Sequence, residues 1–162
     1  MKKILSSLSI LLLLAIPAGC TDSKPDVEEQ EDERIYVNGD IREETASVDT
    51  LPTFLQEKEE DMQSLYKLAA THEEVLKYIP CYCGCGESAG HESNYECFVH
   101  EHTGEKVVWD DHGTKCTVCL EIAAEAIIMT KDGHDVKDIR QYIDKKYEGE
   151  EYPPPTNTPM PS

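Results

Sequence analysis

Six cysteines between residues 81 and 119 are the side chains of this sequence best suited to chemistry. A Cys-x-Cys-x-Cys run is followed, after eleven residues, by a single cysteine and then by a Cys-x-x-Cys pair; these are Cys81, Cys83, Cys85, Cys97, Cys116 and Cys119. Gly84 and Gly86 let the backbone of the run turn tightly, which places its thiolates on one side and brings amide groups to the sulfurs. The Cys-x-x-Cys pair falls on the first turn of a predicted helix, where the helix dipole lowers thiol pKa values. Soft thiolates select Cu(I), Zn(II) and similar ions, so the pattern predicts a metal site.

Histidines in the same stretch are candidate additional ligands. The imidazoles of His91, His100 and His112 would complete or gate the thiolate site, although each alone is more typical of a surface or hydrogen-bonding residue. Six thiolates are enough for one closed four-cysteine zinc site with a disulfide, or for a small Cu(I) cluster. His72 and His134 lie outside the stretch and are expected at the surface.

A framework of disulfides is the first alternative to a metal site. Exported domains of this size often carry paired cysteines, each bridge stabilising the fold by ~2–4 kcal/mol, and six cysteines allow 15 pairings. The Cys-x-Cys-x-Cys run counts against it, because residues two apart are poorly placed to bond each other. All three would need partners among the remaining three cysteines, which is a crowded arrangement.

Thiol–disulfide exchange is the second alternative. A strand expected at residues 106–109, followed by Cys116-Thr117-Val118-Cys119 on a helix, resembles the strand–CxxC–helix opening of thioredoxin-like enzymes. However, six residues separate the two elements, and no second βαβ unit follows. The sequence also shows no distinct pair of carboxylates, no phosphate-binding glycine loop and no Ser/His/Asp setting, so we expect a protein that is not an enzyme.

The first 19 residues have the features of an export signal. Lys2 and Lys3 precede an apolar stretch that is shorter than the ~20 residues a membrane-spanning helix needs. Ala18-Gly19-Cys20 resembles the end of a lipobox, with Pro17 standing where an aliphatic residue is usual. We therefore expect a signal peptide at 1–19 and a lipid on Cys20 that holds the protein on the extracytoplasmic face of the bacterial cell membrane. Secretory cleavage after Ala18 is the alternative.

Net charge restricts the partners of the chain. The sequence has 15 basic and 33 acidic residues, a net charge of −18. Such a chain is repelled by nucleic acid and by anionic head groups, so no nucleic-acid partner is expected and membrane contact is assigned to the lipid anchor. The acidity also keeps an exported protein soluble. The identity of a protein partner does not follow from the sequence.

Composition divides the remaining chain into three parts. Residues 20–50 contain many acids and few large apolar residues, which predicts a disordered acidic linker after Cys20. Residues 51–149 are expected to form the cysteine-rich domain. Residues 150–162, rich in proline, are expected to form a second disordered tail.

The domain is predicted to be mainly α, a small helical domain with a central Cys/Gly-rich loop. Apolar residues at helical spacing predict helices over about 52–69, 71–79, 116–131 and 135–147, with Asp135 as the N-cap of the last. Thr71 and Glu74 are read as a capping box. The glycine-rich stretch between the second and third helices is expected to be loop, with at most one short strand or hairpin.

Pro80-Cys81-Tyr82-Cys83-Gly84-Cys85 resembles the hexapeptide of the PCYCGC-motif family of exported bacterial proteins, often lipoproteins. The resemblance extends over about residues 50–147, through Gly90-His91, Asn94, Cys97-Phe98, His112-Gly113, Cys116, Cys119 and a helix with Ile139-Arg140, Ile143-Asp144 and Tyr147. It implies export and a shared cysteine site, and supplies neither a reaction nor a metal. The expected function is therefore a membrane-anchored protein that binds Cu(I), or Zn(II), for sequestration or delivery at the cell surface.

Overall fold

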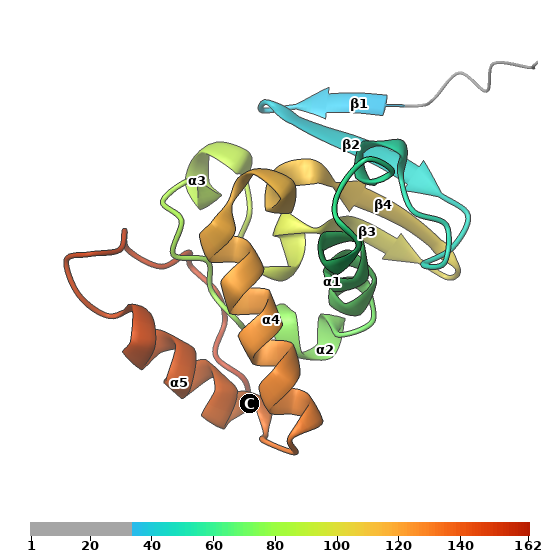
Figure 1. The fold of residues 1–162 in the computed structure, drawn as a ribbon. Coiled ribbons are helices and arrows are strands. Elements are labelled where there is room, and N and C mark those ends of the chain that lie inside the picture. Colours follow the sequence, from blue (N-terminus) through green and yellow to red (C-terminus); the bar gives the residue numbers. More distant parts are fainter. Residues whose placement is uncertain (1–33) are drawn as a thin grey trace, which may run out of the picture. The chain divides into compact units, whose positions relative to one another are not determined.

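A computed structural model describes residues 34–162 (Figure 1). The predicted signal peptide and the predicted lipid attachment at Cys20 lie outside the described residues. Within residues 34–162, no helix combines the length and the apolar character needed to cross a membrane.

A four-stranded antiparallel sheet with the order β1-β2-β4-β3 forms one layer of the domain (Figure 1). Its strands are β1 (Arg34–Val37), β2 (Asp40–Thr45), β3 (Val99–Thr103) and β4 (Lys106–Asp110). Asn38 and Gly39 connect β1 to β2 with φ values of 53° and 92°. Positive φ at both central residues is typical of the tight turn that Asn-Gly favours in hairpins. In the centre of the sheet, Glu43 of β2 pairs with Trp109 of β4.

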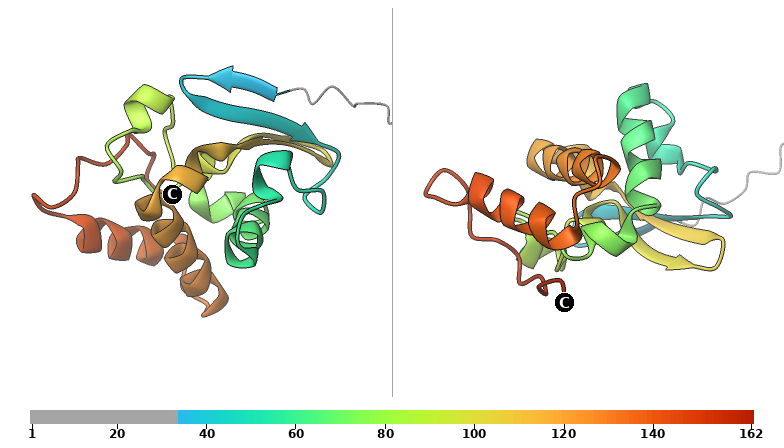
Figure 2. Two further views of the ribbon diagram at one scale, coloured as in Figure 1. Left: turned by 45° about the horizontal axis from the view of Figure 1, so that its top comes forward. Right: turned by 90° about the horizontal axis from the view of Figure 1, so that it is seen from below.

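Helices cover the sheet and extend beyond it (Figure 2). The α-helices are α1 (Glu60–Ala70), α2 (Glu73–Leu76), α3 (Gly86–Ala89), α4 (Thr117–Lys131) and α5 (Val136–Tyr147), and short 3₁₀ helices occupy Thr53–Leu55, Tyr95–Cys97 and Asp111–Lys115. Helix α4 packs against α1, α2 and α5. Tyr66 of α1 links the helices to the sheet. Its fully buried ring meets the Phe98 ring edge-on, with ring centres 5.0 Å apart, and its centre lies 6.2 Å from that of the Trp109 ring.

The prediction of a mainly α domain with disordered tails is wrong. The described residues form a mixed α and β domain, and β1 and β2 occupy residues 34–45, within the predicted linker. Strand β2 reads Asp-Ile-Arg-Glu-Glu-Thr, too polar to predict a strand, yet its charged residues have partners in the fold. Glu43 accepts hydrogen bonds from Thr53, and Arg42 forms an ion pair with Asp110 at 3.0 Å. Pairing with distant residues therefore forms the strand.

The proline-rich tail is also ordered against the domain. Residues 153–161, here called the C-terminal strap, lie along the cysteine loop, where Thr156 N donates to the Cys81 carbonyl (3.0 Å) and Cys81 N donates to Thr156 Oγ1 (2.9 Å). Arg140 Nη1 of α5 donates to the carbonyls of Thr158 and Pro159. Proline lacks the amide hydrogen that sheets need but keeps its carbonyl, so this tail is held by a few specific hydrogen bonds instead of a ladder.

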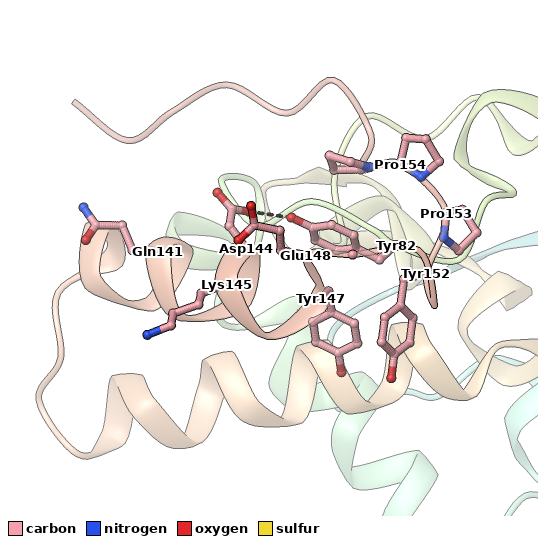
Figure 3. A pocket seen from close by; sticks show the side chains of 11 residues that line it. Tyr82, Gln141, Asp144, Lys145, Tyr147, Glu148, Tyr152, Pro153 and Pro154 are labelled. Carbon is pink, nitrogen blue, oxygen red and sulfur yellow. Dashed lines mark hydrogen bonds between the residues drawn. The ribbon is translucent and has the colours of Figure 1, made fainter.

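Tyrosines line the space between α5 and the start of the strap (Figure 3). Tyr147 stacks on Tyr82 at 5.4 Å and meets Tyr152 edge-on at 4.7 Å, and the Tyr82 hydroxyl donates to Asp144 at 2.8 Å. A cavity of about 780 Å³ opens beside these rings, with Pro154 on its other wall. The cysteine loop is thus held from both sides, by α5 through Tyr82 and by the strap through Cys81.

The last two helices match the predictions, whereas the first two are shorter than predicted: α1 begins at Glu60 and not near residue 52, and α2 covers only Glu73–Leu76 of the predicted 71–79. The helix expected at 116–131 is α4, whose N-cap Cys116 accepts from Cys119 N through its sulfur at 3.4 Å. Asp135 caps α5 as predicted. The capping box at Thr71 is wrong, because Thr71 ends α1 and its hydroxyl donates to the carbonyls of Lys67 and Leu68.

Candidate metal centre

The cysteines come together because one buried asparagine joins the three segments that carry them. Asn94 has no exposed surface. Its N–H donates to the Ile79 carbonyl (2.8 Å), just before the cysteine run, and its Nδ2 donates to the Cys119 carbonyl (3.1 Å) on α4. Its own carbonyl accepts from Cys97 N at 3.2 Å. Asn94 belongs to the motif that carries the family resemblance, but it was not predicted as a site residue, because an asparagine by itself does not show which distant segments it will join.

The run of three cysteines turns back on itself around Gly84. This glycine has φ +77°, and a Cβ placed on it would lie 2.8 Å from Pro153 of the strap. The turn brings the Cys85 thiol to 2.7 Å from Cys83 Sγ, while Cys85 N donates to the same sulfur at 3.3 Å. The tight turn and amide-to-sulfur contact expected from the glycines are therefore present.

The sulfurs form two groups that share Cys83. In the first, Cys81 Sγ lies 3.2 Å from Cys83 Sγ and 3.1 Å from Cys119 Sγ. The second consists of Cys83, Cys85 and Cys116, and within each group the ligand atoms lie within 4.8 Å of one another. Cys97 Sγ lies 3.8 Å from Cys81 Sγ at the edge of the first group. All six predicted cysteine ligands thus come together.

These separations match the reach of a single metal ion. The six cysteines are free thiols, separated by more than the ~2.05 Å of a disulfide bond. With a Zn–S bond of ~2.3 Å, two sulfurs on one tetrahedral ion stand about 3.8 Å apart. To accept an ion, Cys83 and Cys85, at 2.7 Å, would have to spread by about 1.1 Å, and the pairs of the first group, at 3.1 and 3.2 Å, by less; side-chain rotation can supply such movements.

The pKa of the shared Cys83 thiol is lowered more than that of Cys97. Hydrogen bonds from Cys116 and Cys119 lower the pKa of Cys83 to about 4, against the effect of burial. Burial and the neighbouring Cys83 raise the pKa of Cys85, and hydrogen bonds with Cys116 and Cys81 raise that of Cys119. Hydrogen bonds with Cys119 and Cys81 also lower the pKa of Cys97, to about 7. Binding of a metal ion releases the protons of the thiols that ligate it.

His112 lies against the second group of sulfurs and is held by Asp40. Its Nε2 is 3.1 Å from Cys85 Sγ, and its Nδ1 is 3.0 Å from Asp40 Oδ2. Cys83 and Asp40 raise the pKa of His112 to about 9, against burial. A carboxylate behind one ring nitrogen orients the other toward a metal ion. Asp40 is a residue that sequence reasoning missed, since it lies in the segment predicted to be a linker.

The other two predicted histidines occupy different environments. His91 is buried, with 5% of its surface exposed, and lies beside Cys97 and His112. His100 is exposed on β3, where it contacts Arg42 at 3.3 Å, and it belongs to none of the groups of candidate ligands found among residues 34–162. Burial and Arg42 lower the pKa of His100. The structure thus brings His91 and His112 to the cysteines and leaves His100 apart.

The fold and site define a cysteine-rich domain of mixed α and β structure whose clustered free thiols lie within reach of a metal ion. Residues 9–161 match the family described as "Protein of unknown function with PCYCGC motif", and the chain belongs to that family. The resemblance seen in the hexapeptide at Pro80 is thereby confirmed. No curated protein and no solved structure matches the chain.

Proposed function

We propose that the cysteine cluster binds soft metal ions, with Cu(I) as the first candidate and Zn(II) as the second. The observation that carries this proposal is that Cys83 Sγ belongs to both groups of three sulfurs. A thiolate shared between two such groups would bridge two ions, an arrangement suited to a small Cu(I) cluster. Affinity for Cu(I) follows the softness of the ligands, and here the ligands are sulfur.

The setting of the cluster favours holding an ion over catalysis on a free substrate. Cys81, Cys97 and Cys119 are buried, and Cys81 is fixed at both backbone groups by Thr156. The role we assign is sequestration or delivery of the ion.

We further propose that the protein acts outside the cytoplasm, anchored to the membrane by a lipid on Cys20. The support is the apolar leader and the Ala18-Gly19-Cys20 sequence, together with the export that the motif family implies. Replacing Cys20 by Ser should move the protein from the membrane fraction to the medium of expressing bacteria. Retention of the Cys20→Ser variant in the membrane would refute the lipid anchor.

A titration of the reduced full chain with Cu(I), without oxygen and against a chromophoric Cu(I) chelator, tests the metal site. Stoichiometric uptake is expected, and Cys83→Ser should abolish it because one sulfur is lost from both groups. His100→Ala is the matched control and should bind as the parent does, since His100 lies apart from the sulfurs. Full uptake by Cys83→Ser would refute the assignment. A folded protein purified from the exported fraction without free thiols or metal would support a disulfide-stapled interaction module instead.

A further inference from the structure

His91 has an environment that the thiolate cluster does not explain. Its side chain is buried, and neither ring nitrogen has a hydrogen-bond partner within the described residues. Its Nε2 lies 3.5 Å from Asp110 Oδ2, a separation typical of an ion pair rather than a good hydrogen bond. Buried polar groups are almost always hydrogen-bonded, so a buried imidazole whose Nδ1 has no partner within the described residues points to a ligand.

Two other ligands lie around His91. One ligand atom from each of His91, Cys97 and His112 falls within 4.8 Å of the other two, and all three residues are buried. The rings of His91 and His112 meet edge-on at 4.9 Å. The set contains two imidazoles and one thiol, which differs from the all-sulfur groups at Cys83.

Each of the two imidazoles has a carboxylate on one side. Asp40 Oδ2 lies 3.0 Å from His112 Nδ1, and Asp110 Oδ2 lies 3.5 Å from His91 Nε2, which leaves one nitrogen of each ring for an ion. Both carboxylates are neutralised from outside, Asp110 by Arg42 and Asp40 by Lys115. The carboxylates are therefore suited to orient the imidazoles, as outer partners of metal-binding histidines commonly do.

We propose that His91, Cys97 and His112 form a second metal site, which takes borderline divalent ions such as Zn(II). Imidazole nitrogens with a single thiolate suit these ions better than they suit Cu(I), which the sulfur groups would take. The proposal does not rest on the thiolate cluster binding metal, although the two sites adjoin. His112 stands at their border, and its Nε2 can bond one ion at a time.

A cavity supplies a route from solvent to this site. It has a volume of about 460 Å³, and its walls include Cys81, His91 and residues 153–157 of the strap. Glu87 and Glu92 also line it, so an entering cation meets carboxylates before it meets the imidazole. The strap thereby forms one side of the passage to His91.

Co(II) is the probe for the second site, because it reports its ligands through visible absorption and X-ray absorption. The reduced full chain is titrated with Co(II) without oxygen. X-ray absorption should show two imidazole nitrogens and one sulfur around the ion in the parent protein. A first shell of sulfur alone, even after Co(II) has been added beyond the capacity of the thiolate cluster, would overturn the proposal. This measurement requires no variant and therefore does not depend on how a buried substitution folds.

Variants separate the two sites. His91→Gln should weaken Co(II) binding by more than the roughly 10–100-fold loss that removal of an outer partner causes, and should leave Cu(I) uptake intact. His100→Gln is the matched control and should leave both unchanged. Cys83→Ser should retain Co(II) with the nitrogen-rich shell. If folded His91→Gln binds Co(II) as tightly as the parent does, the second site is refuted and the thiolate proposal stands. If the parent takes up no Cu(I), the thiolate proposal is refuted and the second site stands.

Discussion

Thr156→Ala should loosen the C-terminal strap from the cysteine loop. The Thr156 hydroxyl accepts from Cys81 N at 2.9 Å and is also bonded to the Thr158 hydroxyl at 2.9 Å. Alanine removes this acceptor while keeping the backbone bond from Thr156 N to the Cys81 carbonyl. The amide of the buried Cys81 is then left without its partner whenever the strap is in place.

The size of the effect follows from that unpaired amide. A buried donor that loses its acceptor costs ~1–3 kcal/mol, and each 1.4 kcal/mol is a factor of ten in an equilibrium constant. The population with the strap detached should therefore rise roughly 5- to 150-fold. Thr156→Ser keeps the hydroxyl and loses only a methyl group worth ~0.8 kcal/mol, which limits its effect to about fourfold.

Hydrogen exchange of the Cys81 amide measures this opening. Exchange of that amide should accelerate in Thr156→Ala by the same 5- to 150-fold, and transfer of Cu(I) from the loaded protein to a chelator should accelerate in parallel. Equal exchange rates in the parent and Thr156→Ala would show that the hydroxyl does not hold the strap. An equally large change in Thr156→Ser would show that the methyl group, not the hydrogen bond, is responsible.

Three further results are expected from the buried polar contacts. Tyr66→Phe removes a hydroxyl that donates to a backbone carbonyl at 3.0 Å in the core, and urea unfolding should show a loss of ~1–3 kcal/mol; Tyr36→Phe, at a position 71% exposed, should show none. Asp40→Asn weakens the contact that orients His112, so a competition titration should show metal affinity reduced by about 10–100-fold. The control variant Asp138→Asn, at an exposed position, should leave the affinity unchanged. Because the pKa of Cys83 is lowered to about 4, its thiolate should contribute stability to the reduced, metal-free protein that is complete above pH ~9 and is lost as the pH falls toward 4. Thiolate absorbance should show a step near pH 4 that is missing from Cys83→Ser, and a step that persists in that variant would contradict the assignment.

Local patterns predicted α4, α5 and the turn within the cysteine run well, because these features depend on residues close in sequence. Asp135 caps α5 through its own neighbours, and the turn at Gly84 is built within five residues. The alternation of the first three cysteines also shows that they cannot easily pair among themselves, whatever the rest of the fold. Such features are encoded locally and can be read without knowing the tertiary structure.

Features that depend on distant pairing could not be predicted from the sequence. Strand β2 has too few apolar residues to indicate a strand, and it is ordered by pairing with β4, as in Glu43 with Trp109. Nothing in the sequence was a reason to prefer one of the three histidines as a ligand. Only the fold shows that His100 is exposed on β3 whereas His91 is buried. The order of the strap could not be predicted either, because a proline-rich sequence is typical of a disordered tail.

The hydrogen bonds of Asn94 and Thr156 have a consequence for the order of events during folding. The contact from Cys81 to Thr156 joins residues 75 apart, and that from Asn94 to Cys119 spans 25. The entropy cost of closing such long loops must be met before the contacts between their ends can form, so we expect the cluster to assemble late and slowly. Until then the thiols are separate and open to oxidation. The timing of metal loading relative to loop closure would then decide whether a newly made chain matures with its cysteines on an ion or in the wrong disulfides.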